Sequence, residues 1–114
     1  MKLPDFLTKI KETPEEVSFS DTMETIDAFY AFVPQAFKNG DTYNEAGQNN
    51  GSCKIFAFAQ LHELSKEETL ACFGTYYRND VLKNPEGDDH QNIRNFIKYG
   101  WEGIVFEGKA ISMK

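Results

Sequence analysis

Positive charge, cysteine and long apolar runs are all scarce in this sequence. Lys and Arg number 12 against 18 Asp and Glu, which gives a formal net charge of −6 over 114 residues. A general nucleic-acid binder needs an electropositive face to displace phosphate counterions, so this balance excludes that class and also disfavours a polybasic membrane contact. The longest apolar runs are only a few residues long and cannot span a bilayer. The N-terminus lacks the apolar core and cleavage site of a secretory signal peptide.

The two cysteines, Cys53 and Cys72, fall in two different predicted helices. We interpret both as reduced thiols of a protein made in the cytoplasm, and a disulfide between them is the alternative. The cysteines and the histidines, His62 and His90, do not have the spacing of a metal-ligand set. We therefore expect no metal, and no cofactor is needed to explain the composition.

Aromatic residues, in contrast, are abundant: ten Phe, five Tyr and one Trp. With an apolar content of 40%, they supply enough core for a single domain over residues 1–114. Apolar residues recur at helical spacing in several stretches, and the stretch that begins at Cys53 is apolar on nearly every side, which indicates a buried helix. The predicted helices cover residues 3–11, Asp21 toward Pro34, 53–64, 66–77 and 89–99.

Capping residues define the expected helix starts. Asp21 with Glu24, Ser65 with Glu68, and Asp88 with Gln91 have the spacing of a capping box or cap. The polar, glycine-rich run 45–52 predicts a loop, with Ser52 at the start of the third helix. Gly100 is expected to end the fifth helix in a left-handed conformation.

Strand signals lie in the middle and at the end of the chain. Asn39-Gly40-Asp41 is a strong hairpin signal, and it predicts strands near 31–38 and 41–45, with Pro34 at an edge or bulge. The tail over 103–108 and 110–113 reads as one or two further strands. The predicted class is α+β: about five short helices packed on a small antiparallel sheet, made of the hairpin near 31–45 and the C-terminal strand 103–108.

Long stretches of the chain closely resemble the HopJ family of type III effectors. The resemblance lies in residues 44–60, 70–82, 89–94 and 100–108, together with Phe19-Ser-Asp-Thr-Met23. It implies injection into a plant host, but it brings no established reaction and no catalytic residues. The apolar stripe that starts at Leu3 differs from the flexible, Ser-rich start typical of type III substrates, so a cytoplasmic role and secretion into a host cell both stay open.

The loop before the third helix is the main candidate site. Its backbone N–H groups, the Ser52 hydroxyl and Lys54 lie near a helix N-terminus, an arrangement that binds anions. Together with residues 88–94 it predicts a polar cleft around 44–54 and 88–94 that binds a partner protein or a small acidic ligand. Alternatively, the loop amides make only turn and capping hydrogen bonds, and the arginines pair with carboxylates such as Asp80 or Asp89. The candidate ligand-binding residues are Asn44, Gln48, Asn49, Ser52, Lys54, Arg78 and Arg94.

A thiol-dependent hydrolase is the alternative function. Cys53 would be the nucleophile, because the first turn of a helix favours the thiolate form. His90 would be the base, with Asn92 or Asp89 orienting it. A buried core thiol and a solvated histidine are the simpler interpretation of the same residues.

Overall fold

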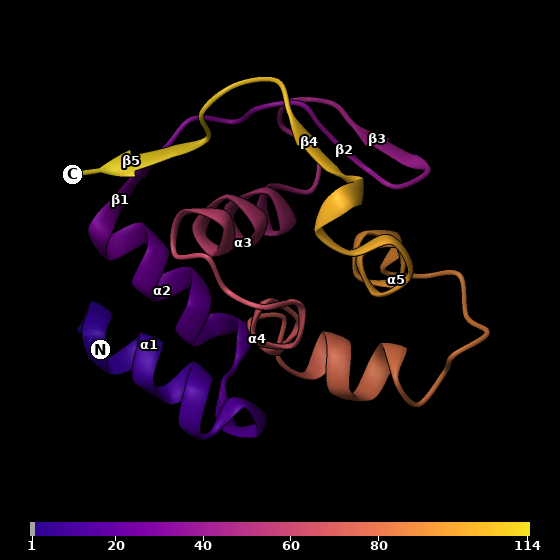
Figure 1. Cartoon of the computed structure of the whole chain (residues 1–114), viewed down its shortest axis with the longest axis horizontal. Coiled ribbons are helices and arrows are strands. Elements are labelled where there is room, and N and C mark those ends of the chain that lie inside the picture. The colour runs from indigo at the N-terminus through magenta and orange to yellow at the C-terminus, as the bar shows by residue number, and fades with distance from the viewer. Residues whose placement is uncertain (1) are drawn as a thin grey trace.

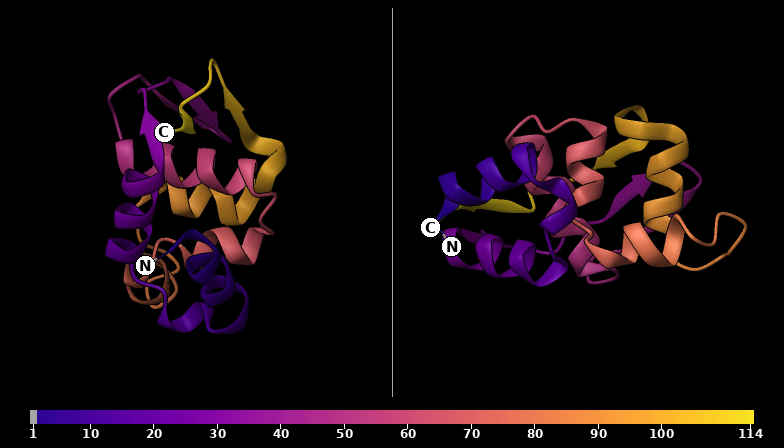
Figure 2. Two further views of the ribbon diagram at one scale, coloured as in Figure 1. Left: turned by 90° about the vertical axis from the view of Figure 1, so that its left-hand side faces the viewer. Right: turned by 90° about the horizontal axis from the view of Figure 1, so that it is seen from below.

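The computed structural model describes residues 2–114 and has its helices on one side and its strands on the other (Figures 1 and 2). The longer helices are α1 (Leu3–Glu12), α2 (Phe19–Phe29), α3 (Asn50–Leu61), α4 (Lys66–Ala71) and α5 (Gln91–Tyr99). Short helical segments are η1 (Pro14–Glu16), the π-helical η2 (Tyr76–Val81) and η3 (Gly100–Gly103). The strands are β1 (Tyr30–Phe32), β2 (Phe37–Asn39), β3 (Thr42–Asn44), β4 (Ile104–Phe106) and β5 (Ile111–Met113).

The strands form two antiparallel sheets, one of three strands in the order β3-β2-β4 and one that pairs β1 with β5. The α+β class, the hairpin at Gly40-Asp41 and the return of the C-terminal strand to it are therefore confirmed. The single strand expected over 31–38 is wrong. Pro34 lies in the break between β1 and β2, and because proline has no N–H to donate, the ladder cannot continue through it.

Helix α3 crosses the middle of the molecule and is the centre of the core (Figure 1). Phe56 is fully buried, and its ring centroid lies 5.0 Å from that of Phe96, 5.5 Å from Phe73 and 6.0 Å from Phe37. These tilted and edge-on contacts are the arrangements that aromatic quadrupoles favour. The prediction of a buried third helix is confirmed, as is the apolar stripe of α1, where Phe6 and Ile10 are fully buried.

Three helices begin at residues other than those expected. Helix α2 starts two residues early, because Ser18 is its N-cap: the Asp21 N–H donates to Ser18 Oγ at 3.0 Å and the Ser18 N–H donates to Asp21 Oδ2 at 3.4 Å. Asp21 is thus the third residue of the box and not its cap. Helix α3 starts three residues before the predicted position 53, at Asn50, and α5 starts at Gln91, with Asp88 outside it.

The fourth helix is much shorter than the expected span 66–77. Its Ser65–Glu68 capping box is confirmed, but α4 ends at Ala71 and Gly74 follows at a φ of +62°. A side chain at this position would place its Cβ 2.6 Å from the backbone nitrogen of Phe19, so only glycine fits there. The chain then resumes as the π-helical η2, which the sequence did not predict. Gly100 ends α5 with a positive φ of +65°, as expected, but its ψ of −157° lies outside the left-handed helical region that was predicted.

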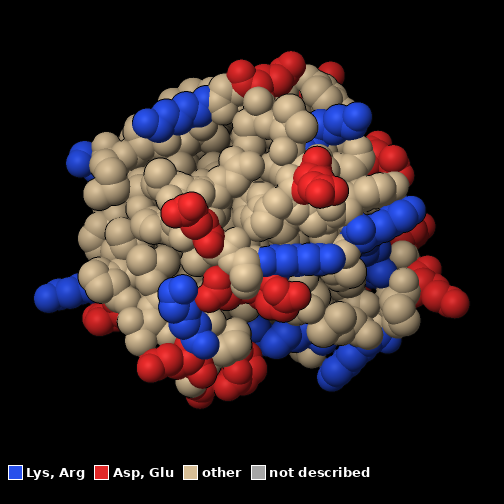
Figure 3. Space-filling model, in the orientation of Figure 1, with Lys and Arg blue, Asp and Glu red and all other residues tan. Residues whose placement is uncertain are grey.

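Charge is distributed without large single-sign areas on the face shown in Figure 3, where basic and acidic side chains lie interspersed. Within residues 2–114, no helix has both the length and the apolar character needed to cross a membrane.

Candidate functional site

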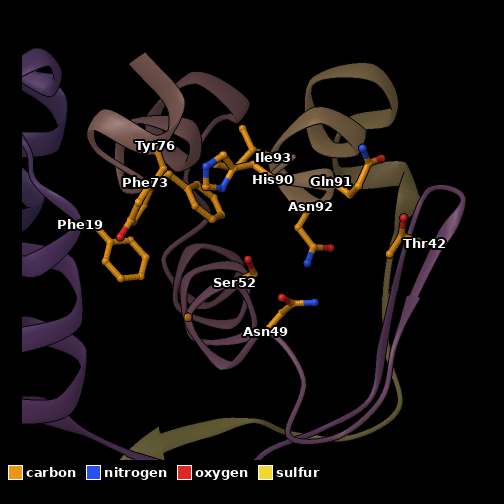
Figure 4. Close-up of a pocket in the computed structure, with 11 residues that line it drawn as sticks. Phe19, Thr42, Asn49, Ser52, Phe73, Tyr76, His90, Gln91, Asn92 and Ile93 are labelled. Carbon is orange, nitrogen blue, oxygen red and sulfur yellow. The ribbon is translucent and has the colours of Figure 1, made fainter. Parts of the chain in front are cut away.

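A cleft of about 460 Å³ opens between the first turns of α3 and α5 (Figure 4). Its volume falls in the usual range for small-molecule sites. Asn49, Gly51 and Ser52 line it from the start of α3, and residues 90–93 line it from the start of α5. Thr42 of β3 lies at one end, and the rings of Phe19, Phe73 and Tyr76 lie at the other. The structure thus brings parts of the two predicted segments, 44–54 and 88–94, to one cleft.

Four asparagine side chains, which we call the amide cluster, connect the hairpin to both helix starts. Asn92 Oδ1 accepts hydrogen bonds from Asn39 Nδ2 at 3.1 Å and from Asn44 Nδ2 at 3.0 Å, and Asn92 Nδ2 donates to Asn44 Oδ1 at 3.0 Å. Asn49 Nδ2 donates to the same Asn44 Oδ1 at 2.7 Å. Asn39, Asn44 and Asn92 are buried. The cluster therefore fixes the positions of β2, β3, α3 and α5 around the cleft.

The two helix starts at the cleft have no side-chain cap among residues 2–114. The backbone N–H groups of residues 50–52 in α3 and of 91 and 92 in α5 have no acceptor in the described part of the chain. Such orphan donors carry the positive end of the helix dipole. The arrangement therefore favours a negatively charged group in the cleft.

Both residues that precede these helices have a left-handed backbone. Asn49 has a φ of 52° and His90 a φ of 48°, and among residues 2–114 the only other non-glycine residue with positive φ is Glu63. This conformation is costly for residues with a Cβ, and such strain is found where function requires a special geometry. Two of these three positions, Asn49 and His90, line the cleft.

His90 is oriented by a carboxylate from η2. Its Nε2 lies 3.1 Å from Asp80 Oδ2 and 3.9 Å from Asp89 Oδ2, and its ring centroid lies 5.2 Å from that of Tyr76. From the sequence, Asn92 or Asp89 was predicted to orient the His90 ring. Instead, Asn92 belongs to the amide cluster, and Asp89 Oδ1 accepts a hydrogen bond from Arg94 at 2.6 Å.

Cys53 lacks the features of an activated nucleophile. It is only 1% exposed and is not among the residues that line the cleft, and its Sγ donates to the carbonyl of Gln35 at 3.7 Å. Burial raises the pKa of the Cys53 thiol, against the thiolate expected from its place in the first turn of α3. Cys72 is likewise buried, and burial raises its pKa to about 12. Both are free thiols of the core, so the geometry gives no support to the hydrolase.

The predicted basic residues do not reach the cleft. Lys54 pairs with Asp27 at 2.8 Å. Arg78 donates to the carbonyls of Pro14 and Val17, at 3.2 and 2.7 Å. Arg94 donates to Asp89 and to the carbonyl of Asn84, at 2.6 and 2.8 Å. These three side chains hold neighbouring segments in place, so none of them supplies charge to the cleft.

Of the remaining candidates, only some face the cleft. Asn49 and Ser52 line it, whereas Asn44 lies behind the wall in the amide cluster. Gln48 Oε1 accepts from the backbone N–H of Glu45 at 3.0 Å, which is the turn hydrogen bond of the alternative interpretation. In the part of the chain that the structure describes, no three His, Cys, Asp or Glu side chains are grouped to hold a metal ion.

Several lining residues were not expected from the sequence. The capping-box pattern at Ser18 predicts that Phe19 is the first residue of its helix, so the sequence held a signal for the local structure of Phe19. Nothing in the sequence pairs Phe19 with the start of α3, where a Cβ on Gly51 would lie 2.8 Å from the Phe19 ring. The other lining residues outside the two predicted segments are Thr42, Phe73 and Tyr76, whereas Gln91 and Ile93 lie within segment 88–94 but were not singled out as site residues.

Comparison with known proteins gives two matches. The family model described as HopJ type III effector protein matches residues 3–111. A crystal structure described as that of the unknown function protein VPA0580 is 56% identical in sequence and superposes with a TM-score of 0.99, over 100% of this chain and 95% of the other. No curated protein matches the chain.

Proposed function

This chain belongs to the HopJ type III effector family, and on that premise we propose that it is a binding protein that takes a small acidic ligand into the cleft between α3 and α5. The observation that carries the proposal is the convergence of two uncapped helix starts on one cleft of about 460 Å³. As a family member, the protein is proposed to be made in the bacterial cytoplasm and to act after delivery by a type III system.

The physical basis is the set of unpaired donors. Backbone N–H groups of residues 50–52 and 91–92 are available, and the Ser52 hydroxyl has no partner among the described residues. An anion with two or more oxygens satisfies several of these donors at once. None of the lining residues within 2–114 is Asp, Glu, Lys or Arg, and the lining histidine, His90, already interacts with Asp80, so backbone and side-chain dipoles hold the ligand.

Titration with inorganic phosphate, followed by amide resonances in nuclear magnetic resonance spectra, tests the proposal. We expect the resonances of residues 50–52 and 91–92 to move together with one dissociation constant. Ser52→Asp adds a carboxylate to the first turn of α3, which is favourable for the helix but repels an anion, and it should weaken phosphate binding about tenfold or more. Ser52→Asn is the matched neutral control: it also replaces the hydroxyl but adds no charge, so it should bind phosphate more tightly than Ser52→Asp.

Two results would contradict the proposal. One is the absence of a saturable shift at these amides with phosphate and with the carboxylate probes named below. The other is equal binding by Ser52→Asp and Ser52→Asn, since that would place the anion elsewhere on the protein. Unfolding curves of both variants separate loss of binding from loss of fold.

A further inference from the structure

We infer that the ligand of this cleft carries a planar aromatic ring in addition to its acidic group. This inference rests on the proposed function and concerns the end of the cleft opposite Thr42. There, Phe19, Phe73, Tyr76 and His90 lie together (Figure 4), and we call them the aromatic wall.

Contacts between the rings hold the aromatic wall in place. The centroids of Phe19 and Tyr76 are 5.1 Å apart at an interplanar angle of 75°, and those of Tyr76 and His90 are 5.2 Å apart at 39°. His90 is in turn held by Asp80, and the backbone of Phe19 packs closely against Gly74. A surface that is already ordered loses little conformational freedom when a ligand packs on it.

Tyr76 is the most exposed part of this wall. Its side chain is among the exposed large apolar groups, at 42%, although two aromatic neighbours flank it. The hydroxyls of Tyr30, Tyr43 and Tyr99 form hydrogen bonds with side chains. Those of Tyr76 and Tyr77 have no hydrogen-bond partner among residues 2–114, and of these two only Tyr76 lines the cleft. An ordered ring left open beside a cleft is a surface on which another ring can pack.

The opposite side of the cleft is polar. Asn49, Ser52, Gln91 and Asn92 lie there, close to the unpaired N–H groups of both helix starts (Figure 4). A ligand that fills the cleft therefore contacts polar donors on one side and rings on the other. An aromatic acid meets both surfaces, whereas a saturated acid of the same size lacks the favourable ring contacts.

The inference is tested with two acids of equal charge and similar size, benzoate and cyclohexanecarboxylate. Ring packing should make benzoate bind about 3- to 10-fold more tightly. Tyr76→Leu should remove this preference, so that the two acids bind the variant with about equal affinity. Tyr43→Leu, which removes an exposed tyrosine from the outer face of the sheet, is the matched control and should keep the preference.

The outcomes separate this inference from the proposed function. Equal affinity of wild-type protein for the two acids, with shifts at residues 50–52 and 91–92, overturns the aromatic preference and leaves the acidic site standing. A benzoate preference that survives Tyr76→Leu also overturns the inference, because the ring would then pack elsewhere. No binding of either acid or of phosphate rejects the proposed function and the inference with it.

Discussion

Helices α2 and α4 begin in a different way from α3 and α5. The first pair starts with complete capping boxes, Ser18 with Asp21 and Ser65 with Glu68, in which side chains satisfy the first-turn N–H groups. The second pair starts after a residue of left-handed backbone and has no side-chain cap among residues 2–114. The first arrangement serves the stability of the fold. The second leaves backbone donors free at the cleft, so other contacts must hold the start of each helix in place.

The amide cluster performs that task. Asn39 and Asn44 of the hairpin bind Asn92 in the first turn of α5, and Asn49 binds Asn44 from the start of α3. A cap is worth about 1 kcal/mol, whereas a buried polar network loses more when one member is removed, because its partners are left unsatisfied. The two kinds of helix start should therefore respond differently to mutation.

The largest effect is expected for Asn92→Ala. The variant loses three side-chain hydrogen bonds of the buried amide cluster. Asn39 then keeps only its hydrogen bond to the backbone carbonyl of Asn92, and Asn44 keeps those to Asn49 and to the carbonyl of Phe37. We expect the free energy of unfolding in urea to fall by about 2–4 kcal/mol. Asn95→Ala is the control, because Asn95 lies in the same helix but makes one hydrogen bond, to Thr42 Oγ1. A loss for Asn92→Ala no larger than that for Asn95→Ala would show that the cluster does not hold the helix starts.

Three serine-to-alanine substitutions compare the helix starts directly. Ser18→Ala and Ser65→Ala each remove a cap and should lower the free energy of unfolding by about 1 kcal/mol. Ser52→Ala, in the first turn of α3, should change it by less than about 0.5 kcal/mol, because the Ser52 hydroxyl makes no hydrogen bond among the described residues. Equal losses at the three positions would mean that Ser52 also acts as a cap and would remove the distinction.

The smallest expected effect is a change in the pH dependence of folding stability. The hydrogen bond from Lys9 lowers the pKa of Asp21, and the backbone hydrogen bond from Ser65 lowers the pKa of Glu68. Since the folded values lie below the ordinary values of 3.8 and 4.5, the stabilisation is present above these values and is lost as the pH falls through the lowered ones. Asp21→Asn should therefore be less stable at neutral pH and lose less stability on acidification. Both groups are near the surface, so the change is a few tenths of a kcal/mol.

Glu24→Gln is the control for this measurement. It removes a carboxylate from the exposed side of the same helix without touching the capping box. Unfolding curves at neutral and acidic pH give, for each variant, the slope of the free energy of unfolding against pH. An equal reduction of the slope in both variants would assign the effect to net charge and not to the box.

Much of the fold follows from the sequence because the signals are local. The stripe of α1, the all-round apolar surface of α3 and the Asn-Gly turn each depend on residues a few positions apart. The start of α2 was harder to predict because two overlapping capping-box patterns are present in the sequence. Ser18-x-x-Asp21 and Asp21-x-x-Glu24 both have the spacing of a box, and the structure uses the first, in which Asp21 also binds Lys9 at 2.9 Å. The end of α4 depends on the backbone of Phe19, more than fifty residues away, and no local signal reveals it.

The candidate site was predictable only in part. The residues that line the cleft from the predicted segments, Asn49, Ser52, His90 and Asn92, stood out because of their type and their place near helix starts. Lys54 and Arg94 stood out for the same reason, but a helix surface turns through 100° per residue, and both lie on sides that face carboxylates instead of the cleft. The aromatic wall combines residues 19, 73 and 76 with the start of α5, and this combination exists only in the folded chain.

The pairing of β1 with β5 and of β2 with β4 also determines the order in which parts of the chain can fold during synthesis. Phe32 pairs with Ile111 and Phe37 with Phe106, so both sheets join segments separated by about two thirds of the chain. Such distant contacts pay a large loop-closure entropy, whereas the helices of the N-terminal half depend on local contacts. A growing chain that has reached only α5 therefore has its helices but exposes the unpaired edges of β1 and β2. Until β4 is added, the free edge of β2 in the hairpin is open to pairing with a strand of another molecule.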